Sequence, residues 1–293
     1  MLYYIIYFIA FFVSLLPFKV LYFLSDLLYF PFYYCIRYRR KIVRKNLTES
    51  FPDKAKKEII GIEKKFYAFF CDYLVETLKL LSIRKTSIYK RMKFINANVL
   101  NESIHQGRSC GMYLGHYCNW EWMTSLPMHT YKQVVCGQIY HILENKVFER
   151  LCLRLREKHG AICIPMSETL RKIITFRNEN KSFIIGFISD QVPLWNSIHY
   201  WTNFLNHDTP VFTGTERIAK QTNLVVYYAD ITRSKRGYYV CEFRKLTDSP
   251  TDFPDYEITE MYMRELEKTI IKAPQYWLWT HNRWKRTRKE YEN

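Results

Sequence analysis

The sequence predicts an α/β fold, a mixed and largely parallel sheet flanked by helices, preceded by an amino-terminal helical segment that anchors the chain to a membrane. Three observations lead to this prediction. Short apolar runs alternate with amphipathic segments from residue 110 onward, which is typical of strands separated by helices. No internal repeat, low-complexity tract or Gly/Ser linker divides that region. The first 18 residues, in contrast, contain no charged side chain.

Composition limits the classes of function. Hydrophobic residues make up 48% of the chain and aromatic residues 17%, yet 25% of the residues are charged. This mixture excludes a polytopic membrane protein and favours a globular body with a membrane-facing surface. We expect one α/β domain, residues 37–293, behind an anchor of residues 1–36. The net charge of +16 indicates acidic partners: nucleic acid, anionic lipid, a phosphorylated substrate or an acidic carrier protein.

The eight cysteines are scattered, and no two of them form a CxxC pair. Most lie in apolar segments, so we interpret them as reduced, buried side chains of a protein in the cytosolic compartment. No pair has the spacing of zinc ligands, and the sequence predicts neither a metal site nor a cofactor.

The amino terminus contains two apolar segments. Residues 1–18, MLYYIIYFIAFFVSLLPF, would extend about 27 Å as a helix, just enough to cross the hydrocarbon core of a bilayer. No basic region precedes this run and no small-residue cleavage site follows it, which argues against a cleaved signal peptide. Residues 20–36 are interrupted by Asp26 and Pro31 and are better interpreted as a helix lying in the membrane interface. A span and an interfacial anchor both remain possible for the segment as a whole.

A basic run, RYRRKIVRK, follows the apolar segments directly. Basic residues beside an anchor favour the cytoplasmic face, because they are retained there and attract anionic headgroups. The alternative is a buried core helix followed by a solvated basic face.

The body divides into helical and strand-like segments. Apolar residues recur at threes and fours over 53–81, which predicts a helix, and 85–107 is expected to form a second helical unit. The expected strands are 110–115, 133–138, 161–165, 183–189, 223–230 and 238–246. The expected intervening and closing helices are 120–127, 144–159, 167–178, 212–222 and 254–272.

One motif stands at the end of the first predicted strand: GHYCNWE, residues 115–121. Eight histidines and 28 acidic residues in 293 predict about one chance His-x4-Glu pair, so the spacing alone carries no weight. The context is more informative, because sites in α/β sheets form at the carboxyl ends of strands. His116 and Glu121 would be about 140° out of register on a continuous helix. They can meet only if His116 precedes the helix, in a turn that Gly115 permits.

A histidine with a carboxylate partner can perform general-base catalysis. The neutral imidazole takes a proton from a hydroxyl, while the carboxylate fixes its tautomer and stabilises the imidazolium. The chain has no GxSxG motif to supply a serine nucleophile, so the hydroxyl most simply belongs to the substrate. A thiol mechanism through Cys118, and a purely structural His116, are the alternatives.

At this point the chain resembles the late (secondary) acyltransferases of lipid A biosynthesis, within the lysophospholipid-acyltransferase-like superfamily. GHYCNWE is similar to the family's Gly-His-aromatic-Gly-Asn-Trp-Glu block. Five further segments resemble family blocks in the same order: RRKIVRKNLTESFPD (39–53), LRLREKHG (153–160), ISDQVP (188–193), TPVFTGTERIAKQTNLVVYYADITR (209–233) and APQYWLWTHNRWK (273–285).

The resemblance implies a glycerolphosphate-acyltransferase-like fold and an acyl transfer. A fatty acyl group would pass from acyl carrier protein to the hydroxyl of a 3-hydroxyacyl chain on a phosphorylated glucosamine disaccharide. The enzyme would lie at the inner (cytoplasmic) membrane, with its catalytic domain on the cytoplasmic face. No nucleic-acid partner is implied.

The resemblance also implies roles for particular residues. His116 would be the base and Glu121 its partner. Either Arg154 or Arg156 would hold phosphate or the thioester oxyanion. The remaining residues expected to contact substrate are Asn119, Asp190 and Gln191. A turn that merely caps the next segment is the alternative for the last two.

The closing block is expected to be structural. Its tryptophans would pack or lie in the interface, and its basic residues Arg283, Lys285, Arg286 and Arg288 would face acidic headgroups. Two departures from the family pattern leave the acyl chain length open: Cys118 replaces the usual Gly, and residues 204–206, FLN, replace an aromatic-Phe-Gly turn.

Two rival functions remain. The nearer is a superfamily acyltransferase that acts on a lysophospholipid or an amino-lipid, with CoA or a carrier protein as donor. The other is a non-catalytic basic protein of the membrane surface, or one that binds nucleic acid, since basic and aromatic residues interleave throughout.

Overall fold

A seven-stranded, mostly parallel sheet forms the centre of the computed structural model, which describes residues 2–292. Its strands are β1 (Met92–Phe94), β2 (Cys110–Leu114), β3 (Val135–Tyr140), β4 (Ile162–Pro165), β5 (Phe183–Ile188), β8 (Val225–Lys235) and β9 (Tyr238–Thr247). They lie in the order β1-β9-β8-β2-β5-β3-β4, and only the pair β8 and β9 is antiparallel. A separate hairpin joins β6 (Trp201–Phe204) to β7 (His207–Pro210).

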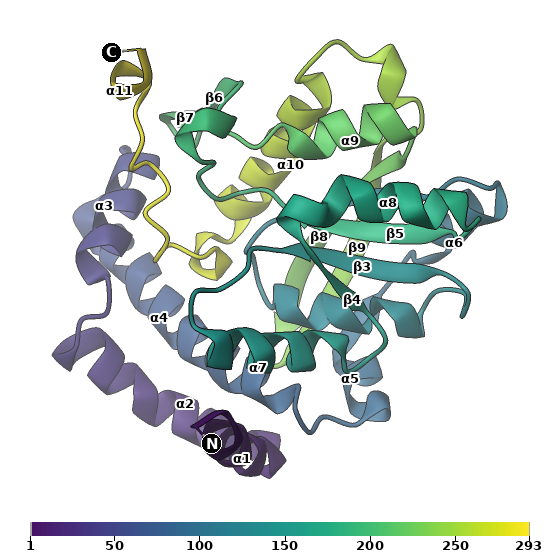
Figure 1. The fold of residues 1–293 in the computed structure, drawn as a ribbon. Helices are drawn as coiled ribbons and strands as arrows, with labels where there is room; N and C mark the ends of the chain where they lie inside the picture. The colour runs from purple at the N-terminus through teal and green to yellow at the C-terminus, as the bar shows by residue number, and fades with distance from the viewer. Residues whose placement is uncertain (1, 293) are drawn as a thin grey trace.

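Helices cover both sides of this sheet (Figure 1). The α-helices of residues 37–292 are α3 (Arg40–Ser50), α4 (Lys56–Lys79), α5 (Lys85–Arg91), α6 (Asn98–His105), α7 (Lys146–Glu157), α8 (Thr169–Asn178), α9 (Gly214–Thr222), α10 (Glu257–Lys272) and α11 (Arg288–Glu292). Of these, α3 packs on α4 and α11 lies beside β7, away from the sheet. Every residue of β2 is buried, as are five of the six residues of β5. Two-sided cover explains why these strands are continuous apolar runs rather than alternating ones.

The structure confirms the predicted α/β architecture, and the six strands expected from residue 110 onward are found in that order, but the β6–β7 hairpin was not predicted. The prediction of one helical unit over 85–107 is wrong in one respect. Met92–Phe94 leaves the helix and pairs with β9 as a three-residue edge strand, so α5 and α6 are separate. A strand of three residues is too short for its alternation to be recognised in the sequence.

The amino-terminal segment forms two helices that pack on α4. They are α1 (Leu2–Leu15) and α2 (Phe18–Phe30), and a π-helical turn, η1 (Pro31–Cys35), continues α2. Lys79 at the end of α4 donates hydrogen bonds to the carbonyls of Ser14 and Leu16, at 2.7 and 2.9 Å. The two helices cross the lower left of Figure 1, beneath α4.

None of the helices among residues 2–292 is by itself both long and apolar enough to cross a membrane. Within that described range, one helix pair, Tyr3–Leu15 and Phe18–Cys35, meets the test when taken together, and it bends by 114°. Because α1 ends at Leu15, its 14 residues extend only about 21 Å. A straight span over 1–18, one of the two possibilities that the sequence left open, is therefore not found among residues 2–292.

The outward faces of these two helices and of the following turn remain apolar. Their exposed large hydrophobic residues are Tyr4, Ile5, Phe8, Ile9, Phe12, Leu15, Val20, Phe23, Leu27, Phe30, Tyr34 and Ile36. So many exposed large apolar side chains in one segment are uncommon on a monomeric soluble protein and are typical of an interaction surface.

Candidate active site

Two neighbouring strands bring His116 and Asp190 together. The parallel strands β2 and β5 are in register, with Leu114 opposite Ile188. His116 and Asp190 each lie two residues beyond that last pair, at the carboxyl edge of the sheet. The architecture therefore places an imidazole beside a carboxylate where α/β proteins commonly hold their sites.

The carboxylate of Asp190 is held by three donors. One oxygen lies 2.5 Å from Nδ1 of His116, and the other accepts the backbone N–H of His116 and the indole N–H of Trp277, both at 2.7 Å. The Asp190 side chain is 1% exposed. Burial raises its pKa, but His116 and the hydrogen bonds outweigh that effect and hold the pKa below the usual value. Asp190 is thus an ionised acceptor.

The hydrogen bonds of His116 indicate its tautomer. Because Nδ1 faces an ionised carboxylate, it carries the proton, which leaves Nε2 as the acceptor. The side-chain nitrogen of Gln191 lies 3.3 Å from Nε2. The His116 side chain is 19% exposed, and the edge of Trp120 packs against its ring at 5.0 Å between centroids. Nε2 is therefore the ring nitrogen left to accept a proton, and the amide of Gln191 contacts it.

Glu121 does not contact His116 directly, in contrast to the expectation from the motif. Glu121 lies in the first turn of a 3₁₀ helix, η2 (Trp120–Met128), and points toward α7, where Arg156 donates two hydrogen bonds to it, of 2.8 and 2.6 Å. Burial raises the pKa of Glu121, but the Arg156 guanidinium outweighs it and lowers the pKa overall. The Glu121–Arg156 ion pair is therefore separate from the His116–Asp190 pair, although Glu121 and His116 belong to the same turn.

The two candidate arginines differ in position. Arg156 is 23% exposed, and its third guanidinium nitrogen has no hydrogen-bond partner among residues 2–292. Arg154 is exposed and lies over the ring of Tyr7 in α1, at 4.4 Å from the ring centroid. Of the two, only Arg156 contacts the turn that carries His116.

Asn119, expected to contact substrate, is fully buried instead. Its side-chain nitrogen donates to Glu76 of α4 at 2.7 Å. Asn119 therefore links the turn to the interior of the protein rather than facing a substrate in this structure.

Cys118 occupies an unusual backbone conformation in the middle of the turn. Its φ is +51°, a left-handed value that favours glycine, and glycine is the usual residue of the related motif at this position. Burial raises the pKa of the Cys118 thiol well above its usual value. A protonated, buried thiol is a poor nucleophile, which argues against a thiol mechanism.

Gly115, in contrast, has no positive φ. A Cβ atom there would overlap Leu266 of α10 and lie 3.4 Å from Asp190. This glycine therefore permits close packing rather than the sharp exit that the sequence suggested.

The carboxy-terminal block holds the turn from the other side. Tyr117 and Trp277 form an antiparallel bridge, and the carbonyls of His116 and Tyr276 accept the N–H groups of Leu278 and Cys118. Trp277 and Trp279 are buried, as expected of packing residues. The sequence did not predict that the indole N–H of Trp277 donates to Asp190. The position of Trp277 in the closing block was the one feature that could have suggested a role near the site.

Arg283 was expected to face acidic headgroups, but it is fully buried and cannot do so. It donates to the carbonyl of Pro210 at 2.7 Å, and burial lowers its pKa to about 10. Arg286 and Arg288 do reach the surface. Together with Lys45 and Lys289 they line an open groove of about 600 Å³.

A small apolar cavity lies beside Trp120, between η2 and the sheet. Its volume is about 30 Å³, room for only a few water-sized spheres. Met112, Gly137 and Gly186 line it together with Trp120. No group of three or more His, Cys, Asp or Glu side chains that could hold a metal ion is found among residues 2–292.

Comparison with known proteins adds one finding to this geometry. The family model described as bacterial lipid A biosynthesis acyltransferase matches residues 1–286, nearly the whole chain. A search of curated proteins gives no match.

Proposed function

Since the chain belongs to the bacterial lipid A biosynthesis acyltransferase family and is an acyltransferase, we propose that it transfers a fatty acyl group from acyl carrier protein to the hydroxyl of a 3-hydroxyacyl chain on a lipid A precursor. The observation that carries the mechanism is the 2.5 Å contact between His116 Nδ1 and the buried Asp190 carboxylate. It leaves Nε2 as the acceptor nitrogen of a side chain that is 19% exposed.

His116 is the general base in this proposal. Nε2 takes the proton of the acceptor hydroxyl as its oxygen attacks the thioester carbonyl, which forms a new C–O bond and a tetrahedral oxyanion. The C–S bond then breaks, and the thiolate receives that proton from the imidazolium. Asp190 stabilises the imidazolium and keeps Nδ1 protonated throughout. Gln191 must move aside from Nε2 to admit the hydroxyl.

Glu121 acts through Arg156 rather than through His116. The two hydrogen bonds from Glu121 fix the guanidinium, and the remaining nitrogen of Arg156 is free to bind the oxyanion or a substrate phosphate. Arg156 therefore takes the role expected of one of the two arginines, and Glu121 is its positioning residue.

The cavity beside Trp120 is the proposed entry for the acyl chain. At about 30 Å³ it holds far less than a fatty acyl group, so Met112 and other lining side chains must move when the donor binds. Glycine at 137 and 186 puts no side chain into this cavity, which leaves its space to a hydrocarbon chain.

The exposed apolar faces of α1 and α2 support attachment to the inner membrane, with the body on its cytoplasmic face. The groove lined by Lys45, Arg286, Arg288 and Lys289 supports a phosphorylated acceptor, because its cations outnumber its carboxylates, Glu49 and Asp208. The net charge of +16 suits an acidic carrier protein as donor.

Mass spectrometry of lipid A tests this function. Cells that lack the gene should accumulate a lipid A lighter by one acyl group, and wild-type protein but not His116→Ala should restore it. Purified full-length protein should use acyl carrier protein thioesters in preference to CoA thioesters. Unchanged lipid A in cells without the gene, or full complementation by His116→Ala, would contradict the proposal.

A further inference from the structure

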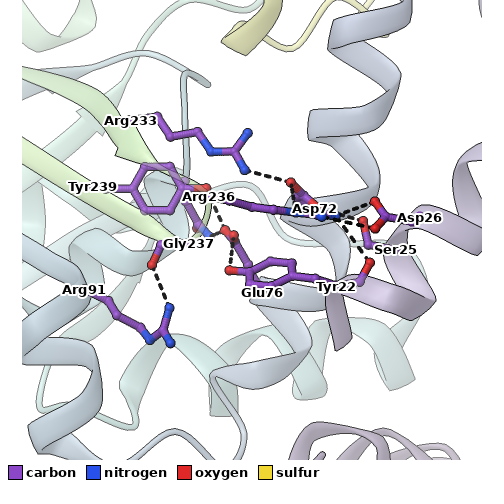
Figure 2. Close-up of polar contacts among 11 residues, drawn as sticks. Tyr22, Ser25, Asp26, Asp72, Glu76, Arg91, Arg233, Arg236, Gly237 and Tyr239 are labelled. Atoms are coloured by element: carbon purple, nitrogen blue, oxygen red, sulfur yellow. Dashed lines mark hydrogen bonds and ion pairs between the residues drawn. The ribbon is translucent and has the colours of Figure 1, made fainter. Parts of the chain in front are cut away.

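A polar cluster, buried at Asp72, Glu76 and Tyr239 and exposed at Asp26, joins α2 to α4 and to the β8–β9 hairpin (Figure 2). We call it the α2 clamp. Its members are Tyr22, Ser25 and Asp26 of α2, Asp72 and Glu76 of α4, and Arg233, Arg236 and Tyr239 of the hairpin. The proposed reaction uses none of these side chains, although buried charges are costly unless a fold needs them.

The first part of the clamp is centred on Asp72. Its carboxylate accepts hydrogen bonds from Ser25 at 2.7 Å, Arg233 at 2.7 Å and Arg236 at 2.6 Å. Arg236 also binds Asp26 at 2.6 Å, so the hairpin tip holds α2 directly. Asp72 is bound by two guanidinium groups, and this part attaches α2 to the body.

The second part is centred on Glu76, which is fully buried. One of its oxygens accepts the hydroxyl of Tyr22 at 2.9 Å. The other accepts the hydroxyl of Tyr239 and the side-chain amide of Asn119, both at 2.7 Å. Burial raises the pKa of Glu76, whereas its three donors oppose that rise. Glu76 thus connects α2 with the turn that carries His116.

Two further contacts, at Gly237 and at Trp122, support the connection between α2 and the turn that carries His116. A Cβ atom at Gly237 would overlap the hydroxyl of Tyr22, and Gly237 has a φ of +72°, so the hairpin tip admits Tyr22 because it is a glycine. Trp122, next in the chain to Glu121, donates its indole N–H to the backbone carbonyl of Glu76 at 3.2 Å and packs against Phe18 of α2.

We propose that Tyr22 and Glu76 are positioning residues for acyl transfer: the bond between them holds Asn119, and with Asn119 the turn that carries His116 and Glu121. This inference rests on the function proposed above. The opposite side of α2 exposes Val20, Phe23 and Leu27. The helix that offers an apolar face to the membrane therefore also supports the catalytic turn.

Steady-state kinetics of the full-length protein test this inference with matched variants. Tyr22→Phe removes only the hydroxyl that binds Glu76, and Glu76→Gln keeps the shape of the side chain. Ser25→Ala is the control, because it also removes one buried hydrogen bond of α2 but from the part of the clamp that does not reach Asn119. Thermal unfolding is measured for all three, and His116→Ala is assayed alongside.

Tyr22→Phe and Glu76→Gln should lower kcat about 10-fold with KM unchanged, because a small displacement of a catalytic group is enough for such a loss. Ser25→Ala should keep kcat within about 2-fold of wild type, at a similar decrease in Tm. The inference is overturned if Tyr22→Phe has a normal kcat, or if Tyr22→Phe and Ser25→Ala lose kcat equally. If His116→Ala is inactive in the same assays, the proposed function still holds. Active His116→Ala refutes the proposed function, and the inference with it.

Discussion

The segment GHYCNWE holds its two ends in different ways. At the first end, His116 meets a carboxylate that follows a neighbouring strand, and its other ring nitrogen contacts only the side-chain amide of Gln191 among the described residues. At the other end, Glu121 is buried and bound on both oxygens by Arg156. The first arrangement can exchange a proton, whereas the second holds a fixed charge.

The difference shows that a short motif can combine two separate pairs rather than one. Sheet register joins His116 to Asp190, and the 3₁₀ geometry of η2 directs Glu121 to α7. Substitutions at the two ends should therefore fail in different ways. Substitutions at the His116 end should lower the rate of acyl transfer. Substitution of Glu121 should lower the free energy of unfolding as well.

The largest effect is expected at the His116 end. Asp190→Asn keeps the size of the side chain but presents an N–H to His116 and favours the wrong tautomer. We expect kcat to fall about 10⁴-fold, as when the carboxylate of a catalytic triad becomes an amide, with the protein still folded. Steady-state assays of the purified variant measure the loss. A kcat within 10-fold of wild type would remove Asp190 from the mechanism.

At the Glu121 end we expect a loss of stability. Glu121→Ala leaves the partly buried Arg156 without its carboxylate, which should cost about 3 kcal/mol of the free energy of unfolding. Denaturant unfolding in detergent measures this loss, and the double variant Glu121→Ala with Arg156→Met is the control, since it removes both charges. Wild-type stability in Glu121→Ala would show that the ion pair does not support the turn.

Between the two ends, Cys118 allows a sharper test of the turn. Cys118→Gly and Cys118→Ala both remove the thiol, but only glycine adopts a φ of +51° without strain. Glycine should therefore be the more stable of the two by about 1 kcal/mol, the reverse of its usual rank against alanine. Thermal unfolding decides the sign, and a more stable alanine variant would contradict the left-handed conformation.

The smallest effect concerns His281, near the Asp190 end. Its Nε2 accepts the N–H of Val192, and burial lowers its pKa to about 4. Because the unfolded chain binds the proton more tightly, stability should be unaffected above the ordinary pKa of about 6.5 and should fall from there toward pH 4. At pH 6 the loss should be below about 1 kcal/mol. If His281→Gln shows the same difference in Tm between pH 7.5 and pH 6 as the wild type, groups other than His281 cause that difference.

The sequence predicted the architecture well because the buried strands are distinct apolar runs separated by amphipathic helices. It also placed His116 and Asp190 at strand ends. It could not pair them, because β3 and β4 come between β2 and β5 in the chain, and only the crossover order of the sheet makes β2 and β5 neighbours. Trp277 was beyond prediction for the same reason, since 87 residues separate it from Asp190.

The amino-terminal helices illustrate a different limit. Their sequence is apolar on nearly all sides, so it did not indicate which face packs on the body. The structure buries Leu21 and Ser25 against the body and exposes Phe23 and Leu27. Ser25 and Asp26 are the polar residues that bind this face to Asp72 and Arg236, and their partners lie too far along the chain to be inferred.

The most direct test of the account is a double-mutant cycle of acyl-transfer rates for wild type, His116→Ala, Asp190→Asn and the double variant, with residual rates measured by mass spectrometry over long incubations. If Asp190 acts through the imidazole, Asp190→Asn should lower the wild-type rate about 10⁴-fold, yet change the rate of His116→Ala by less than about 3-fold. Equal losses in both backgrounds would show that the two residues act independently, and would contradict the proposed pair.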